Sequence, residues 1–180
     1  RALDATPQLL NMKKADPDFA ICQETSVMAT ILKDAKKLNL RTKFFALNWA
    51  MSGKLRDLAG DAAEGCYWTN PFCLWTDDAP GVKEAKAASE KYHPGKVQIV
   101  NYFQGFTAMK VMAEAISHVK GEVSGPAIKA ALENMTDFDT GGLTVPISFS
   151  AKSHKGSMGL NIYQVQGGKF VPVKKVLLSR

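Results

Sequence analysis

The order of hydrophobic and polar positions in residues 1–70 predicts alternating helices and strands. Short apolar runs bounded by turn residues predict three buried strands, at residues 18–22, 43–47 and 65–69. Thr6-Pro7 and Asp16-Pro17 predict the start and stop of a short helix at residues 6–14. Apolar spacings predict helices at residues 25–39 and 52–63, with Thr25 or Ser26 capping the first of these two. This alternation predicts an α/β fold, with a parallel sheet connected by right-handed crossovers.

The pattern changes after Pro71. Residues 70–81 are predicted to form a connecting segment without regular structure. Helices are predicted at 80–92, 102–119 and 124–135. The long middle helix places Phe106, Met109, Ala113 and Ile116 on one apolar stripe. Strands are predicted at 97–100, 143–149, 160–165 and 170–176. Gly167-Gly168 predicts a tight hairpin between the last two.

Composition and charge narrow the classes of function. The 180 residues are 46% hydrophobic and 22% charged, as in ordinary globular proteins. The net charge of +6 comes from scattered lysines without a basic stripe, so we expect no nucleic-acid partner. No apolar run has the length of a membrane span, and the first residues lack a signal-peptide pattern, so we expect that any secretion signal has been removed or was never part of these residues.

The cysteines and glycines suggest no catalytic or metal chemistry. Cys22, Cys66 and Cys73 form no CxxC and have no His at ligand spacing. Gly141-Gly142 and Gly167-Gly168 are turn pairs, and no phosphate-loop or dinucleotide motif occurs. We therefore expect no metal and no cofactor. A hydrolase with Cys22 as nucleophile and one of the histidines as base is the enzymatic alternative.

The expected binding site lies where the parallel strands end, because ligands of open α/β sheets bind beyond the carboxyl ends of the strands. Trp49 is the sharpest candidate, since an indole there could stack on a planar or apolar ligand, although it could equally pack on its own helix. Asn48 is a hydrogen-bonding candidate or a turn former. The residues expected at these strand ends are Gln23, Glu24, Thr25, Asn48, Trp49 and Phe72.

Two further candidates stand at the start of the predicted helix 102–119. Free backbone N–H groups at Tyr102 and Gln104 could meet an anion such as a carboxylate. First-turn packing and capping are the alternative roles of these residues.

The two ends of the chain do not balance. The chain opens on a helix without the strand that should precede it, and three parallel strands with a terminal hairpin make a small sheet. We therefore expect these residues to be a fragment, with the missing half elsewhere in the same protein or replaced by a second copy of the chain.

Several segments carry a family resemblance. They are Ala15-Asp-Pro-Asp-Phe19, Leu58-Ala-Gly-Asp-Ala-Ala-Glu-Gly65, Phe138-Asp-Thr-Gly-Gly-Leu-Thr144 and, in the tail, His154-Lys-Gly156, Ile162-Tyr-Gln-Val165 and Gly168-Lys-Phe-Val-Pro172. These segments resemble branched-chain amino-acid-type ABC transporter substrate-binding proteins. The resemblance implies the periplasmic-binding-protein type I fold, in which two Rossmann-like lobes with parallel sheets enclose the ligand. Residues 1–70 plus 148–180 would form part of the second lobe, and 71–147 the returning part of the first.

The resemblance also implies a function. Such proteins are non-catalytic, reside in the periplasm or outside the membrane with or without a lipid anchor, and deliver a small molecule to an inner-membrane ABC permease. Family members that bind amino acids carry a glutamate for the ligand's ammonium where Asn48 stands here. The expected solute is therefore amino-acid-like, a carboxylate or an amide. The alternative is a ligand-sensing domain of a receptor or regulator with the same fold.

Overall fold

The computed structural model describes residues 4–25 and 27–178, so the predicted cap at Ser26 lies outside the described residues. The chain divides into two compact units. Unit 1 comprises the residues up to Asn70 together with Asn161–Lys175, and unit 2 comprises Pro71–Leu160 and the residues from Val176 onward. The lobe assignment implied by the resemblance stays a prediction.

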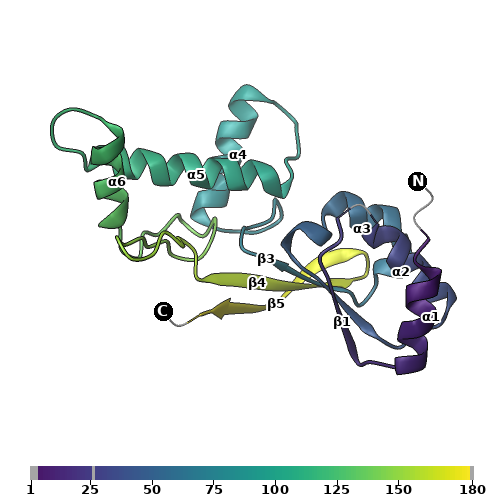
Figure 1. The fold of residues 1–180 in the computed structure, drawn as a ribbon. Coiled ribbons are helices and arrows are strands. Elements are labelled where there is room, and N and C mark those ends of the chain that lie inside the picture. The colour runs from purple at the N-terminus through teal and green to yellow at the C-terminus, as the bar shows by residue number, and fades with distance from the viewer. Residues whose placement is uncertain (1–3, 26, 179–180) are drawn as a thin grey trace. The chain divides into compact units, whose positions relative to one another are not determined.

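Unit 1 is an α/β layer, as the sequence predicts (Figure 1). Its elements in chain order are α1 (Thr6–Ala15), β1 (Phe19–Cys22), α2 (Met28–Lys37), β2 (Lys43–Ala46), the short 3-10 helix η1 (Asn48–Ala50), α3 (Gly53–Ala59), the 3-10 helix η2 (Gly60–Ala63) and β3 (Tyr67–Asn70). The hairpin strands β4 (Gly159–Gln166) and β5 (Lys169–Leu177) complete the sheet.

The sheet is mixed, with strand order β1-β2-β3-β4-β5. The pairs β1–β2 and β2–β3 are parallel, and β3–β4 is antiparallel. This confirms the predicted parallel strands and the terminal hairpin. Gly167 and Gly168 both have positive φ, which glycine adopts at little cost in the tight turn between β4 and β5.

Local stop signals explain the ends of the helices in unit 1. Asp16 follows α1 with φ 46°, and Asn39 follows α2 with φ 53°, left-handed positions that Asp and Asn tolerate better than most residues. The predicted helix 52–63 is divided because Gly60 has φ 60°. Helix α2 begins one residue after Val27, without a side-chain cap, so the expected cap at Thr25 is not formed.

Unit 2 is built from helices α4 (Pro80–Tyr92), α5 (Val100–Ser117) and α6 (Gly125–Glu133). The Ser124 side chain caps α6 by accepting a hydrogen bond from the Ala127 N–H. Two apolar clusters hold the unit: one around Cys73, Val82, Phe103 and Leu143, the other around Val111, Ala115, Met135 and Ile147.

Four sequence predictions about strands and faces are wrong. Residues 97–100 form no strand, because Val100 already begins α5, and 143–149 make only isolated bridges. Helix α5 buries Phe103, Thr107, Val111 and Ala115 rather than the predicted stripe, and Met109 of that stripe is 67% exposed. Strand β1 is not buried, since Phe19 and Ile21 are exposed.

Candidate functional site

The carboxyl ends of β1 and β2 lie side by side in unit 1. Cys22 is paired with Ala46 in the parallel register, and Ala46 with Trp68. The Leu47 N–H donates to the Cys22 carbonyl over 2.9 Å, which carries the pairing one residue beyond β2. The next residues, Gln23 and Asn48, therefore leave the sheet at the same edge, as the topology predicts.

The segment after β2 is anchored by hydrogen bonds within its own turn and from the neighbouring strand β3. Its 3-10 turn is closed by the Ala50 N–H donating to the Leu47 carbonyl over 2.8 Å. The indole N–H of Trp68 donates to the Asn48 carbonyl over 3.1 Å, and Trp68 is buried beneath it. The side chain of Ser52 then caps α3 by accepting from the Leu55 N–H. The backbone of Asn48 is thus fixed by a core residue of the neighbouring strand.

This arrangement presents the side chain of Trp49 to the outside. Trp49 is 46% exposed, whereas Ala50, directly after it, is fully buried. Asn48 is half-buried. A large aromatic surface next to an amide, on a loop anchored by the core, can stack on a planar or apolar group and hydrogen-bond a polar one.

The residues after β1 are open to solvent. Gln23, Glu24 and Thr25 are all exposed. Glu24 borders an apolar groove formed with α1, α2 and the sheet, and neither Asn48 nor Trp49 lines that groove. Gln23, Asn48 and Trp49 therefore share the strand-end edge of unit 1, while Glu24 also faces the groove.

The candidate residues Phe72 and Tyr102 of unit 2 form backbone bridges or hydrogen bonds with other residues of the same unit. Phe72 forms an isolated bridge with Thr144. The hydroxyl of Tyr102 donates to the Ala85 carbonyl over 2.9 Å, and the Tyr102 N–H donates to the Ile99 carbonyl over 3.0 Å. The Tyr102 amide is therefore not one of the free groups that the sequence suggested. Gln104 is half-buried in α5, which begins earlier than predicted, at Val100.

Two other hollows were not anticipated from the sequence. One hollow, of about 460 Å³, lies in unit 1 at the start of β2 and just before the start of β3. Its lining residues include Arg41, Lys43, Glu64 and Cys66. Because it opens at the amino ends of the parallel strands, it is at the opposite end from the expected site. The other, of about 560 Å³, is formed by Ser148–Met158 of unit 2. No motif in the sequence marks either hollow.

The thiols are poorly suited to nucleophilic chemistry. Burial raises the pKa of Cys22, and burial with the nearby Cys22 raises the pKa of Cys66 to about 12. A thiol with a raised pKa is protonated at neutral pH and is a weak nucleophile. His118 and His154 are paired with Glu114 and Glu133, both within unit 2. The geometry gives the Cys22 hydrolase hypothesis no support.

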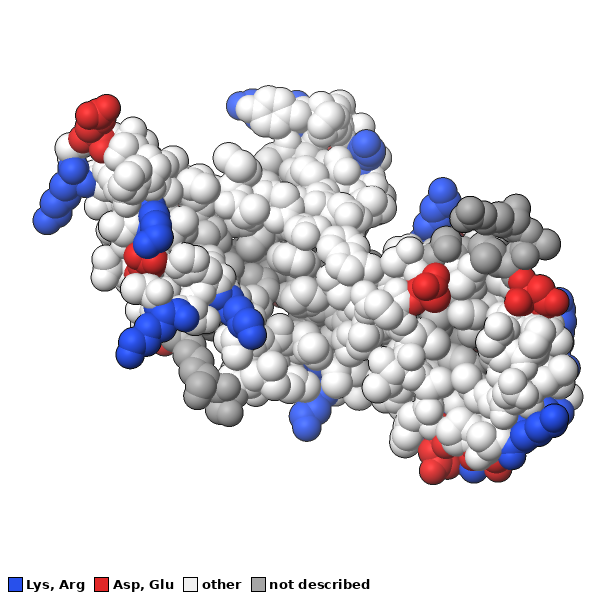
Figure 2. All heavy atoms as spheres, viewed as in Figure 1, with Lys and Arg blue, Asp and Glu red and all other residues white. Residues whose placement is uncertain are grey.

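Charge is dispersed over both units. On the face seen in Figure 2, each unit carries basic and acidic side chains. In unit 1 many are paired, as in Lys36–Asp61 at 2.6 Å and Arg41 with Asp16 and Asp18. Within residues 4–25 and 27–178, no three His, Cys, Asp or Glu side chains gather as a metal site. None of the helices described there has the length and apolar character to cross a membrane.

The sequence matches the family described as periplasmic binding protein over residues 1–169. A comparison with curated proteins gave no match. Among solved structures, a branched chain amino acid ABC transporter from Thermus thermophilus with bound valine is 31% identical, with a TM-score of 0.87 over 98% of this chain and 50% of that one.

Other matched structures are more distant and show the fold. A substrate binding protein of an ABC transporter from Aeropyrum pernix is 23% identical, with a TM-score of 0.84 over 95% of this chain and 47% of that one. A solute binding protein from R. palustris in complex with benzoate is 17% identical, with a TM-score of 0.72 over 96% and 47%.

The chain spans about half the length of the solved structures that it matches. The match extends over nearly all of its own residues, so both units take part in it. The fold and the resemblance to branched-chain amino-acid-type binding proteins, both expected from the sequence, are confirmed. The chain belongs to the periplasmic binding protein family.

Proposed function

We propose that this chain is part of the extracytoplasmic solute-binding component of an ABC importer and binds a small solute at the strand-end edge of unit 1. The carrying observation is the parallel register that sends Gln23 and Asn48 out of the sheet together, next to exposed Trp49. Family membership supports the same function. In this proposal the protein makes and breaks no bond and delivers its solute to an inner-membrane permease.

Two side chains supply most of the recognition in this proposal. Trp49 stacks on the apolar or planar part of the solute, because its exposed indole stands on an anchored loop. Asn48 gives and accepts hydrogen bonds through its side-chain amide. Gln23 and Thr25 add polar groups from the neighbouring strand end.

The proposed solute is a small carboxylate or amide rather than an ordinary α-amino acid. Asn48 stands approximately where the amino-acid-binding proteins that it resembles carry a glutamate. A neutral amide does not replace the charge-assisted hydrogen bond to an ammonium group, which is about twice as strong as a neutral one. Glu24 is the one nearby carboxylate among the strand-end candidates that could serve an ammonium group instead.

Capture is proposed to work by closure of two lobes on the solute. A solute that contacts both lobes binds the closed state more tightly and shifts the population toward it. Phe72, Tyr102 and Gln104 are the proposed contributions of the other lobe. Small-angle scattering should then show a smaller radius of gyration when the solute is added.

The test uses a chimera in which these 180 residues replace the matching half of the Thermus thermophilus protein. Small molecules released from the purified chimera by denaturation are identified by mass spectrometry, and their affinities are measured by calorimetry. We expect a carboxylate or amide to bind, and Asn48→Glu to shift preference toward valine by about tenfold or more. A bound solute whose affinity is unchanged by Asn48→Glu and Asn48→Ala would exclude this site.

A further inference from the structure

The turn that carries the two main solute contacts of the proposed site has little support of its own. It is the 3-10 helix η1, which the Ala50 N–H closes by donating to the Leu47 carbonyl over 2.8 Å. A 3-10 turn this short has poorer hydrogen-bond geometry than an α-helix. Ala50 and the following Met51 are buried, which holds the end of the turn. Asn48 is only half-buried and Trp49 is exposed, so the start of the turn needs another support.

Trp68 of β3 supplies this support. Its indole N–H donates to the Asn48 carbonyl over 3.1 Å, and its side chain is almost completely buried. An indole has a single donor, and a buried indole usually finds one partner for it. Here that partner belongs to the proposed solute site rather than to the core. A core side chain therefore fixes the position of the backbone from which the Asn48 amide extends.

Aromatic residues of the β4–β5 hairpin hold the indole of Trp68 in turn. The ring centroid of Phe170 lies 4.7 Å from that of Trp68, and the ring centroid of Tyr163 lies 5.8 Å from it. Tyr163 also stands opposite Trp68 in the antiparallel register of β3 and β4. The guanidinium of Arg56, on helix α3, lies over the Phe170 ring at 4.9 Å. The chain before and after the loop is thus connected to one aromatic cluster, formed by Trp68, Tyr163 and Phe170.

We propose that Trp68 is a positioning residue of the solute site, and that its indole N–H sets the place of Asn48 and Trp49 without touching the solute. This inference rests on the proposed function, since it concerns the same site. Trp68 is 1% exposed, so it acts through the turn. A turn that is already in place loses less conformational freedom when the solute binds, and this raises the affinity.

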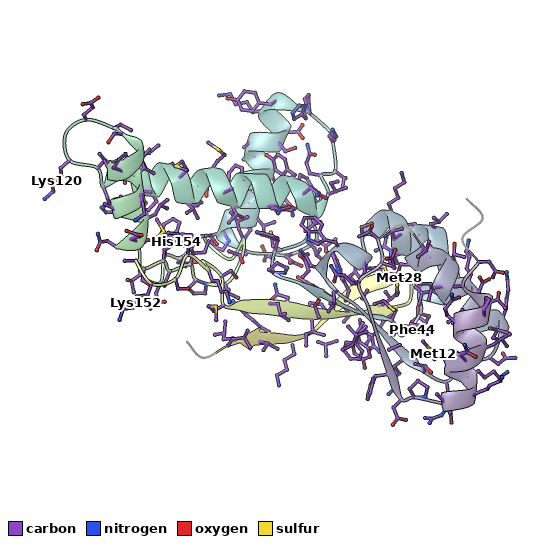
Figure 3. All side chains as sticks on the ribbon, viewed as in Figure 1. Met12, Met28, Phe44, Lys120, Lys152 and His154 are labelled. Atoms are coloured by element: carbon purple, nitrogen blue, oxygen red, sulfur yellow. The ribbon has the colours of Figure 1, made fainter. Side chains whose placement is uncertain are left out.

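Two variants separate positioning from general stability. Trp68→Phe keeps an aromatic ring in the cluster and removes the N–H that reaches Asn48. Phe44→Leu is the matched control, because Phe44 (Figure 3) is buried on the same face of β2 as Ala46. Its ring has no donor for the turn, so the control destabilises unit 1 and leaves the hydrogen bond to Asn48 in place.

Hydrogen exchange in the 180-residue chain tests the positioning role without any solute. Nuclear magnetic resonance compares the Ala50 amide, which closes the turn, with the Leu47 amide, which donates to the Cys22 carbonyl in the sheet. Trp68→Phe should raise the ratio of the Ala50 rate to the Leu47 rate by about three- to tenfold, because the turn opens more often. Phe44→Leu should raise both rates together and leave the ratio unchanged. An unchanged ratio in folded Trp68→Phe would overturn the proposal.

Affinity for benzoate, a planar carboxylate, is the second readout, measured by calorimetry on the Thermus thermophilus chimera. Trp68→Phe should weaken it by about three- to tenfold, and Phe44→Leu should leave it unchanged. The double variant Trp68→Phe with Asn48→Ala should lose less than the product of the two single losses, because the Asn48 amide is already displaced. Losses that simply multiply would overturn the positioning role.

The outcomes distinguish this inference from the proposed function. If Trp49→Ala weakens benzoate binding and Trp68→Phe does not, the inference is overturned and the proposed site is supported. If benzoate does not bind, that result counts against the proposed solute class, and the exchange ratio decides the inference. A raised ratio then supports the positioning role of Trp68, and an unchanged ratio overturns it.

Discussion

The two faces of the parallel strands in unit 1 differ sharply, although both are apolar in sequence. On the face toward α2, Phe44, Ala46 and Trp68 are buried. On the opposite face, Phe19 and Ile21 are exposed, and Phe45 stacks on Tyr67 with ring centroids 4.5 Å apart. The comparison teaches that an apolar strand is not necessarily a covered one, and that burial depends on what the rest of the protein supplies.

Helix α5 in unit 2 likewise has one buried apolar side and one exposed apolar side. Phe103, Val111 and Ala115 are buried on one side, while Met109, Met112 and Ile116 are exposed on the other. The faces that these 180 residues bury by themselves carry their stability. The exposed faces should contribute little until another part of the protein covers them.

The largest expected effect comes from truncating one phenylalanine on each face of the sheet. Phe44→Ala removes a ring that is 6% exposed and should cost about 3–5 kcal/mol. Phe19→Ala removes a ring 57% exposed, in edge contact with Phe45, and should cost less than about 1 kcal/mol. Urea unfolding followed by circular dichroism measures both, and similar losses would remove the difference between the faces.

The same contrast should hold for α5. Phe103→Ala should cost about 3–5 kcal/mol, because Phe103 is fully buried against Trp75 and Val82. Met109→Ala, on the exposed side, should stay within about 0.5 kcal/mol. Thermal melts of the two variants compare them directly, and a large loss for Met109→Ala would show that its face is covered after all.

The wrong prediction of the buried face of α5 shows what the sequence pattern alone does not contain. Phe106, Met109, Ala113 and Ile116 make a stripe as apolar as the one that is buried. Periodicity finds that a helix is present, but a helix apolar on two sides has two possible inner faces. The choice between them depends on the packing partners, which a local pattern does not contain.

Helix start and stop residues and the order of the elements predicted the structure better than the apolar stripe of α5 did. The bounds of α4 agree with the prediction because Pro80 can begin a helix and His93-Pro94 can end one. The strand-end position of Gln23 and Asn48 followed from the strand–helix alternation. The partners of Tyr102 could not be predicted, because its hydroxyl meets the Ala85 carbonyl on a different helix.

A pH-dependent effect should appear in alkaline solution. The pKa of Cys66, on the buried face, is raised from 9.0 to about 12, so the unfolded chain loses this proton first as pH rises. The stabilisation is fully present below about pH 9 and falls by up to about 1.4 kcal/mol per pH unit between the two pKa values. Cys66→Ala should flatten this part of the stability curve. An unchanged slope between pH 9 and 11 would contradict it.

The smallest expected effect on stability comes from Ile21→Thr on the exposed face. Ile21 is 73% exposed, so the free energy of unfolding should change by no more than about 0.5 kcal/mol. Self-association of the 180-residue chain should decrease, because less apolar surface remains open. Light scattering at increasing concentration measures this, and a clear loss of stability would mean that Ile21 has a packing partner.

The central claim is that the strand-end edge of unit 1 binds the solute, and Trp49 tests it most directly. Calorimetry on the Thermus thermophilus chimera compares Trp49→Ala with Tyr92→Ala, which truncates an exposed aromatic residue of unit 2. We predict that Trp49→Ala weakens solute affinity by about tenfold or more and that Tyr92→Ala leaves it unchanged. Unchanged affinity in folded Trp49→Ala would contradict the account.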